Sequence, residues 1–283
     1  MLLHRVLTGA VGIPIGLLLI YLGGWWFAGA VALIAIGGLR ELYLLLAARD
    51  KKALPWLGYP LALALVAMAA TVHSGPMAAP LGAEAALLVV AFAIAAWWLL
   101  APPARRSGDK LFATISAHVY VPQLLGYLVR LRSMSALSIT PRGSETELPL
   151  GMLLMALLMA VICGMDSAAY GVGSKWGRRK LCPAISPGKT VEGAIAAFLT
   201  AALLSGAIGY WFRLPLVHGI VLGAAIGVLG QAGDLFESML KRRAGVKDSG
   251  AVLPGHGGVL DRFDSLLFAA PAAFFYLSIV TGT

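Results

Sequence analysis

The stretch "PLVHGIVLGAAIGVLGQAGDLFESMLKRR" (residues 215–243) decides the fold of this chain, because an apolar run passes directly into a charged segment. A helix crosses the hydrocarbon core of a membrane with about 20 mostly apolar residues, and residues 215–233 form such a run. Glycine and alanine in "GAAIGVLGQAG" (223–233) are typical of helices that pack closely in a bilayer, and ordinary small-residue packing gives the same pattern. The stretch therefore predicts a membrane-spanning helix that continues into a polar segment.

The rest of the chain repeats this apolar pattern. Of its 283 residues, 59% are apolar and 12% are charged, whereas soluble domains are typically about 45–50% apolar and about 25% charged. Lipid cannot satisfy exposed backbone groups, and the alternating pattern of barrel strands is absent, so the spans must be helices. We predict an all-α polytopic membrane protein with about nine transmembrane helices, at 7–23, 26–46, 56–73, 81–100, 111–131, 149–169, 193–212, 215–233 and 263–281.

The basic residues predict the orientation of these spans. Of the 22 Lys and Arg residues, 18 lie at the N-terminus and in the connections after the second, fourth, sixth and eighth spans. Because cytosolic loops carry the excess of Lys and Arg, we expect a cytosolic N-terminus and an external C-terminus. The net charge of +9 is then mostly a topology signal, and no nucleic acid is expected as a partner. The first 24 residues resemble a signal peptide, but further apolar runs follow, so we expect them to remain as an anchor.

The acidic residues divide the chain into two predicted parts. Residues 1–150 hold six of them, including Glu41, and most lie near predicted loops, where we expect solvated or interfacial charges. Residues 151–283 hold the other seven, inside or beside polar and glycine-rich stretches on the cytosolic side. We therefore expect 1–150 to be a scaffold of transmembrane helices with lipid and possible oligomer contacts. Residues 151–283 are expected to form the catalytic transmembrane region with its cytosolic loops, around a polar funnel.

One helical face of "GDLFESMLKRR" (233–243) collects polar groups. Asp234, Glu237, Ser238 and Lys241 are spaced i, i+3, i+4 and i+7, so they share that face. A carboxylate near the membrane costs free energy, so such residues usually line a cavity or pair with another charge. The alternative is an interfacial helix in which Asp234 or Glu237 forms a salt bridge with Lys241.

Residues 234–265 balance five cations against five anions. A lipid-binding basic patch would be of one sign, whereas this balance suits a divalent cation held by carboxylates beside Lys and Arg that grip phosphates. The glycines of "PGHGG" (254–258) allow close backbone approach to a ligand and expose N–H groups to anions. Asp261 and Asp264 open the last span, at a helix N-terminus. His256 is predicted to contact phosphate or carry a proton, with a structural role as the alternative.

A second polar constellation is "DSAAYGVGSKWGRRKLCPAISPGKTVEG" (166–193). Ser186, Lys189 and Thr190 lie where a turn feeds a helix, which is a plausible anion site. The segment lacks the first glycine and the preceding strand of a phosphate-binding Walker loop. No Ser-His-Asp or Cys-His pattern indicates a protein nucleophile.

The segment "SMLKRRAGVKDSGAVLPGHGGVLDRFD" (238–264) resembles the signature of the CDP-diacylglycerol synthases, also called phosphatidate cytidylyltransferases. The resemblance extends to "SPGKTVEG", to "DSAAYGVGSKWG" and, more loosely, to "RELYLLL" (40–46). Val191 departs from it, because many relatives carry Trp there. The matched signature positions are Ser238, Lys241, Arg242, Lys247, Asp248, Pro254, His256, Gly257, Gly258, Asp261, Arg262 and Asp264.

The resemblance implies that CTP and phosphatidate react to give CDP-diacylglycerol and pyrophosphate, in a bacterial-type inner membrane with the active site facing the cytosol. It implies Mg²⁺ and a homodimer, and it is compatible with a monovalent cation such as K⁺ as a second ion. The implied metal ligands are Asp234 and Asp261. The implied catalytic residues are Lys241, Arg242, Lys247, Asp248, His256, Arg262 and Asp264, and the implied substrate-binding residues are Ser186, Lys189, Thr190, Ser238, Gly257 and Gly258.

Two other functions stay open at this point. Another CTP-dependent membrane transferase or kinase could act on a prenyl or ether lipid, and the bulk composition is equally suited to it. An ion-coupled transporter would also place charges in a membrane, but it predicts charges in the middle of spans and inverted repeats. The charges here gather at one face, and no internal repeat is visible.

Overall fold

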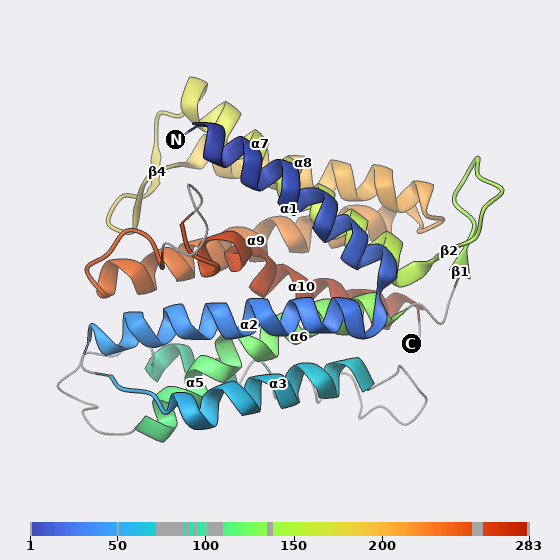
Figure 1. The fold of residues 1–283 in the computed structure, drawn as a ribbon. Helices are drawn as coiled ribbons and strands as arrows, with labels where there is room; N and C mark the ends of the chain where they lie inside the picture. Colours follow the sequence, from blue (N-terminus) through green and yellow to red (C-terminus); the bar gives the residue numbers. More distant parts are fainter. Residues whose placement is uncertain are drawn as a thin grey trace.

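The computed structural model describes residues 2–49, 51–71, 88, 91–92, 95–98, 100, 110–134, 138–250 and 257–281. Figure 1 shows long helices that run roughly along one direction, with a short hairpin at each end of the bundle. The chain begins toward the end where β4 lies and finishes at the end where β1 and β2 lie. The described part is therefore a helical bundle, as the sequence predicts.

The described helices follow the order of the predicted spans, and α5 and α6 together correspond to the span predicted at 111–131. They are α1 (Leu2–Leu22), α2 (Gly24–Ala47), α3 (Pro55–Thr71), α5 (Lys110–Tyr120), α6 (Pro122–Ser133), α7 (Leu150–Trp176), α8 (Val191–Trp211), α9 (Leu216–Arg243) and α10 (Leu260–Thr281). Within the described residues, six helical stretches are long and apolar enough to cross a membrane. An integral, all-α membrane protein is thus confirmed, while the count of nine spans and their orientation stay predictions. Much of the predicted span 81–100 lies outside the described residues.

Two helices extend beyond the apolar runs that predicted them. The span predicted to end at residue 233 continues to Arg243 in α9, and the span predicted to end at residue 169 continues to Trp176 in α7. The charged segments therefore stay helical, and the periodicity that the sequence suggests for residues 234–241 is realised.

The fifth predicted span is broken in the middle. α5 ends at Tyr120 and α6 begins at Pro122, which occupies the first turn of its helix. Proline lacks an N–H group, so it is tolerated at a helix start but interrupts a helix interior. His118, near the end of α5, is buried, with one ring nitrogen 2.7 Å from the Thr114 carbonyl oxygen and the other 2.7 Å from that of Gly58. His118 thus links α5 to α3.

Two small antiparallel hairpins connect the helices. β1 (Ser138–Ile139) pairs with β2 (Leu148–Pro149), and β3 (Lys180–Cys182) pairs with β4 (Ser186–Thr190). The sequence predicts only a turn over the second pair. Thr190 also caps α8, since its hydroxyl accepts a hydrogen bond from the Gly193 N–H at 3.2 Å. The hairpin therefore places residues 186–190 at a fixed position beside the start of α8.

Small residues let α8 and α9 approach closely. Gly219, Gly223 and Gly227 of α9 face α8, and a methyl group added at Gly223 would lie 2.6 Å from Ser205 Cβ and closer still to the Ala201 carbonyl oxygen. Close backbone approach of this kind is typical of helix pairs in membranes. The close contact that "GAAIGVLGQAG" predicts is confirmed.

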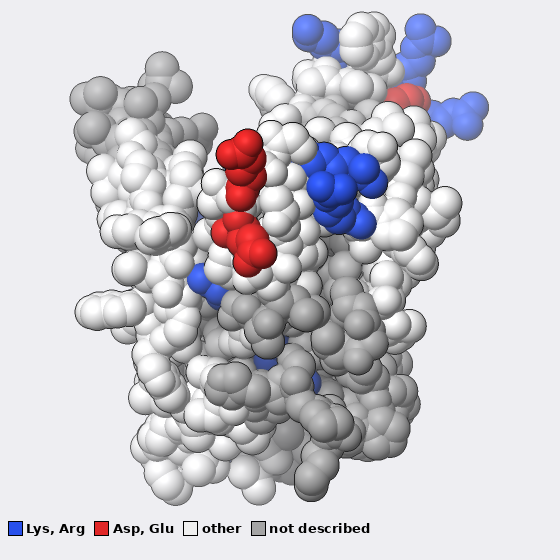
Figure 2. Space-filling view, turned by 90° about the vertical axis from the view of Figure 1, so that its right-hand side faces the viewer, with Lys and Arg blue, Asp and Glu red and all other residues white. Residues whose placement is uncertain are grey.

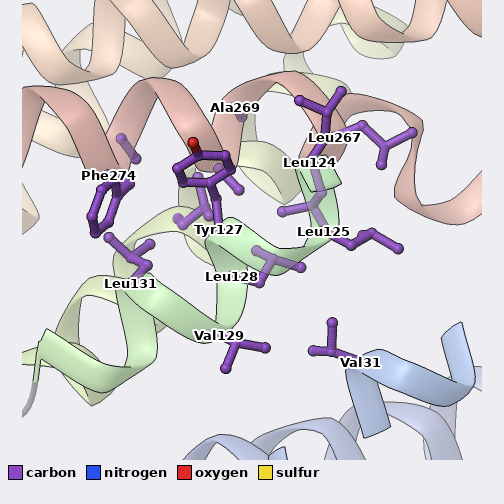
Figure 3. Close-up of a cluster of buried hydrophobic side chains, with 14 of the residues drawn as sticks. Val31, Leu124, Leu125, Tyr127, Leu128, Val129, Leu131, Leu267, Ala269 and Phe274 are labelled. Atoms are coloured by element: carbon purple, nitrogen blue, oxygen red, sulfur yellow. The ribbon is translucent and has the colours of Figure 1, made fainter. Parts of the chain in front are cut away.

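A core of large apolar side chains joins the two halves of the chain. Figure 3 shows Leu124, Tyr127 and Leu131 of α6 against Phe274 and other residues of α10, with Val31 of α2 on the opposite side of α6. Tyr127 and Leu131 are at most 1% exposed. Packing at this density, rather than the hydrophobic effect alone, holds helices together in lipid. The N-terminal helices are therefore packed directly onto the last helix.

Figure 2 views the end of the molecule where β1 and β2 lie, and charged side chains are few on the part of this face that is described. The opposite end carries the ends of α2, α7 and α9 with their basic residues. This asymmetry agrees with the charge distribution from which the orientation was predicted.

We expect Gly223→Ala to destabilise the protein. The added methyl group has no space between α8 and α9, and overpacking of this kind costs about 1–3 kcal/mol. The melting temperature of the purified protein in detergent should fall.

Gly171→Ala in α7 is the matched control, because a methyl group added there meets nothing within 4 Å. Its melting temperature should be equal to or above that of the wild type, since alanine favours helix over glycine. Equal melting temperatures for the two variants would show that the α8–α9 contact is looser than described.

Candidate active site

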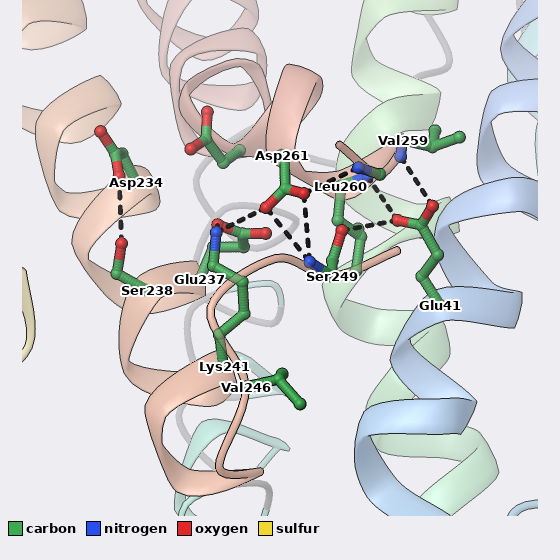
Figure 4. A network of polar contacts seen from close by, with 12 residues as sticks. Glu41, Asp234, Glu237, Ser238, Lys241, Val246, Ser249, Val259, Leu260 and Asp261 are labelled. Atoms are coloured by element: carbon green, nitrogen blue, oxygen red, sulfur yellow. Dashed lines mark hydrogen bonds and ion pairs between the residues drawn. The ribbon is translucent and has the colours of Figure 1, made fainter. Parts of the chain in front are cut away.

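A row of polar groups follows one face of α9, as the spacing predicts. The Ser238 hydroxyl donates to Asp234 Oδ1 at 3.3 Å, and Lys241 Nζ lies 2.6 Å from Glu237 Oε2. Figure 4 shows these side chains on successive turns of the helix. Asp234, at the start of the row, pairs with Lys189 of β4, whereas Lys241, at its end, contacts Glu237 and Asp261. The row therefore divides into two groups.

In the first group, Asp234 lines a cavity of about 410 Å³ between α7, α8, α9 and the β3–β4 hairpin. Lys189 of β4 forms an ion pair with Asp234, with Nζ 2.5 Å from Oδ2, and both side chains keep about a third of their surface exposed, at 27% and 32%. The predicted residues Ser186, Lys189 and Thr190 all line this cavity. Asp166, Gln231 and Ser265 line it as well. The structure therefore joins the segments 166–193 and 234–265, which the sequence could only describe separately.

Three carboxylates act on one another beside this cavity. Asp166, Asp234 and Asp264 repel one another electrostatically, and Lys189 is the cation that offsets them. Mg²⁺ prefers oxygen ligands such as carboxylates, and here three carboxylates are offset by one lysine. As they are placed, no three acidic, histidine or cysteine side chains among the described residues meet at metal-binding distance. The donor chemistry therefore fits a divalent cation, although the described side chains do not form a closed ligand shell.

The second group is buried at the end of α9. Glu237 is fully buried, and Lys241, which is 8% exposed, lies between it and Asp261 of α10, with Nζ 2.5 Å from Asp261 Oδ1. The salt bridge to Glu237 that the sequence analysis held as the alternative is present, whereas Asp234 pairs with Lys189 instead. Glu237 Oε1 and the Tyr120 hydroxyl have no hydrogen-bond partner among the described residues. Lys241 itself forms ion pairs with two carboxylates, those of Glu237 and Asp261.

Asp261 receives several further donors. Its Oδ2 accepts from the Gly258 N–H at 2.8 Å and from the Ser249 N–H at 3.1 Å, in addition to the bond between Oδ1 and Lys241. The carboxylate thus holds the segment that precedes its helix. Its assignment as a metal ligand stays a prediction.

Glu41 of α2 is a site residue that the sequence analysis missed. The expectation that acidic residues of 1–150 are mostly solvated is wrong here, because Glu41 is only 1% exposed. Its carboxylate accepts hydrogen bonds from the Ser249 hydroxyl and from the N–H groups of Val259 and Leu260 (Figure 4). The sequence signals were an acidic residue inside the apolar run "GGLRELYLLL" and the loose family resemblance of "RELYLLL" (40–46). Its partners are 208 to 219 residues away, which no local pattern reveals.

The other predicted residues lie around these two groups. Arg242 donates to the carbonyl oxygens of Ile185 at 3.1 Å and Val246 at 3.0 Å, which ties the end of α9 to the β3–β4 hairpin. Lys247 and Asp248 are exposed in the segment after α9, and Arg262 is exposed on α10. Gly257 adopts a φ of 80°, which favours glycine. His256 and Pro254 lie outside the described residues.

Comparisons with known proteins extend over the whole chain. A model described as the cytidylyltransferase family matches residues 3–280. A phosphatidate cytidylyltransferase of Synechocystis sp. is 34% identical over 98% of this chain and 97% of its own length. One from Staphylococcus aureus is 31% identical over 94% of this chain and 95% of its own length. One from Bacillus subtilis is 38% identical over 59% of this chain and 58% of its own length.

We expect Lys241→Met to destabilise the protein strongly. The variant leaves Glu237 and Asp261 buried without their cation, and breaking a buried ion pair in this way costs about 3–5 kcal/mol. Chemical unfolding of the purified protein in detergent measures the loss.

Arg243→Met is the control at the end of the same helix, where the side chain is exposed. It should change the free energy of unfolding by no more than about 0.5 kcal/mol. If Lys241→Met unfolded like this control, Lys241 would not neutralise the buried carboxylates.

Proposed function

Because the chain belongs to the cytidylyltransferase family, we propose that it is a phosphatidate cytidylyltransferase, which converts CTP and phosphatidate to CDP-diacylglycerol and pyrophosphate. The observation that carries this proposal is the cavity in which Lys189 and Asp234 form an ion pair beside Asp166. A cation and several carboxylates that share a cavity suit a reaction between two phosphate-bearing substrates.

The reaction needs no covalent intermediate with the protein. A phosphate oxygen of phosphatidate attacks the α-phosphorus of CTP, and the bond from this phosphorus to the oxygen that bridges to the β-phosphate breaks. The electron pair of that bond leaves with pyrophosphate. Since both reactants are anions, the protein's contribution is to hold them together and offset their charge. Lys189 is the residue that we assign to this task in the cavity, with Ser186 and Thr190 beside it.

The cofactor that we propose is Mg²⁺, with a monovalent cation such as K⁺ as a second ion. Bound Mg²⁺ neutralises phosphate charge and polarises the phosphorus–oxygen bonds. Asp234 and Asp166 fit as its holders because they line the cavity with Lys189. Asp264 fits as a third carboxylate because it interacts electrostatically with both. Asp261 fits this task less well, since its oxygens already accept from Lys241, Ser249 and Gly258.

The site is proposed to face the cytosol, at the inner membrane of a bacterial cell. This placement rests on the basic residues around the ends of α7 and α9 and the positive-inside rule. CTP would then enter from water, and phosphatidate would enter from the inner leaflet. We also propose a homodimer, on the resemblance alone.

The proposed reaction is tested with the purified protein in detergent, CTP, phosphatidate and Mg²⁺. We expect equal amounts of CDP-diacylglycerol and pyrophosphate, and no product after the metal is removed with a chelator. Asp234→Asn should lower the rate by at least about 100-fold, because the variant removes a fixed charge at the reacting phosphates. Quantified lipid product and released pyrophosphate are the measurements.

Glu145→Gln, an exposed carboxylate between β1 and β2, is the matched control and should keep the wild-type rate. Turnover with a prenyl or ether lipid phosphate but not with phosphatidate would move the substrate assignment to that lipid class. A lack of product with every lipid phosphate would overturn the enzyme assignment and reopen the transporter alternative. Wild-type activity of Asp234→Asn would refute the site.

A further inference from the structure

The glycine-rich segment that leads into α10 is predicted from the sequence to offer backbone N–H groups to anions. In the structure, two carboxylates of the protein already occupy these donors. Glu41 Oε1 accepts from the Val259 N–H at 2.8 Å, and Glu41 Oε2 accepts from the Leu260 N–H at 2.9 Å. Asp261 accepts from the Gly258 N–H at 2.8 Å. A helix N-terminus favours negative charge, and here the protein itself supplies it.

Two glycines of the signature make room for Glu41. A methyl group added at Gly250 would lie 2.6 Å from Glu41 Oε1, and one added at Gly258 would overlap Glu41 Oε2 and the Ser249 hydroxyl. The close approach that these glycines allow is therefore an approach to the carboxylate of α2. This packing explains their presence without a bound ligand at these two positions.

Ser249 links the two carboxylates. Its hydroxyl donates to Glu41 Oε2 at 2.7 Å, while its N–H donates to Asp261 Oδ2 at 3.1 Å. The residues on both sides of the segment 250–257 are thus fixed to the same pair of side chains. Asp261 in turn binds Lys241 of α9, on the helix that carries Asp234.

We infer that Glu41 is a positioning residue for the proposed reaction. It fixes Ser249 and the start of α10, and through Asp261 and Lys241 it sets the position of α10 relative to the charged turns of α9. Glu41 does not line the cavity, so it acts on catalysis without touching substrate. This inference rests on the proposed function, and it adds a residue of the N-terminal half to the site.

Glu41→Gln is the decisive variant. Glutamine has the same shape but only one acceptor oxygen, and its amide group would face a backbone N–H, so at least one bond to α10 is lost. The amides of Val259 and Leu260 should exchange hydrogen at least about 10-fold faster than in the wild type, because their acceptors are weakened. The amides of α8 should exchange at the wild-type rate.

The kinetic effect separates positioning from a purely structural role. Glu41→Gln should lower kcat at least about 10-fold, since small displacements of reacting groups are costly. The KM for CTP should change less than about threefold, because Glu41 does not bind substrate. Ser249→Ala should act in the same direction, and the double variant should be no slower than Glu41→Gln alone, since both changes break one linkage.

Glu145→Gln again serves as the carboxylate control, with wild-type exchange and wild-type rate. Unchanged exchange at Val259 and Leu260 in Glu41→Gln would overturn the linkage. Faster exchange with wild-type kcat would reduce Glu41 to a structural role and overturn the inference. If Glu41→Gln does not fold, Ser249→Ala decides between the same outcomes. A wild-type protein that makes no CDP-diacylglycerol would refute the proposed function, while the exchange measurements would still decide whether the linkage exists.

Discussion

Charges at the end of a membrane helix need partners within the protein, and the contact of Lys241 with Glu237 and Asp261 meets this need for α9 and α10. Glu237 has no exposed surface, so water cannot offset its charge. Lys241 joins this carboxylate to one on a helix that begins about 20 residues later in the chain. The position of α10 against α9, and with it the position of Asp264 near Asp234, depends on this shared lysine.

Small residues and large residues pack different pairs of helices in this bundle. Glycine and alanine let α8 and α9 approach until backbone atoms touch, which places the β4 end of α8 beside Asp234. Large aromatic and aliphatic side chains of α6 fill the space against α10 instead. The cavity lies on the small-residue side, where short side chains leave room between α7, α8 and α9. Helix packing and the formation of the site are therefore consequences of the same sequence pattern.

The N-terminal half is more than a lipid-facing scaffold. α2 contributes Glu41 to the start of α10, and α6 supports the middle of α10. Both contacts hold the helix that carries Asp261 and Asp264. The geometry of a site whose cavity is lined by residues of the C-terminal half thus also depends on residues of the first half.

The sequence by itself determined the membrane class, the order of the helices and the family, because apolar length, charge distribution and the 238–264 signature are local properties of the chain. It also placed Asp234, Glu237, Ser238 and Lys241 on one face, since helical periodicity is local. Only the tertiary structure decided that Asp234 forms an ion pair with Lys189 and that Lys241 forms one with Asp261. It also decided that Glu41 is buried against α10. These pairings join helices far apart in sequence, and they are selected by which charges must be neutralised away from water once the helices have packed.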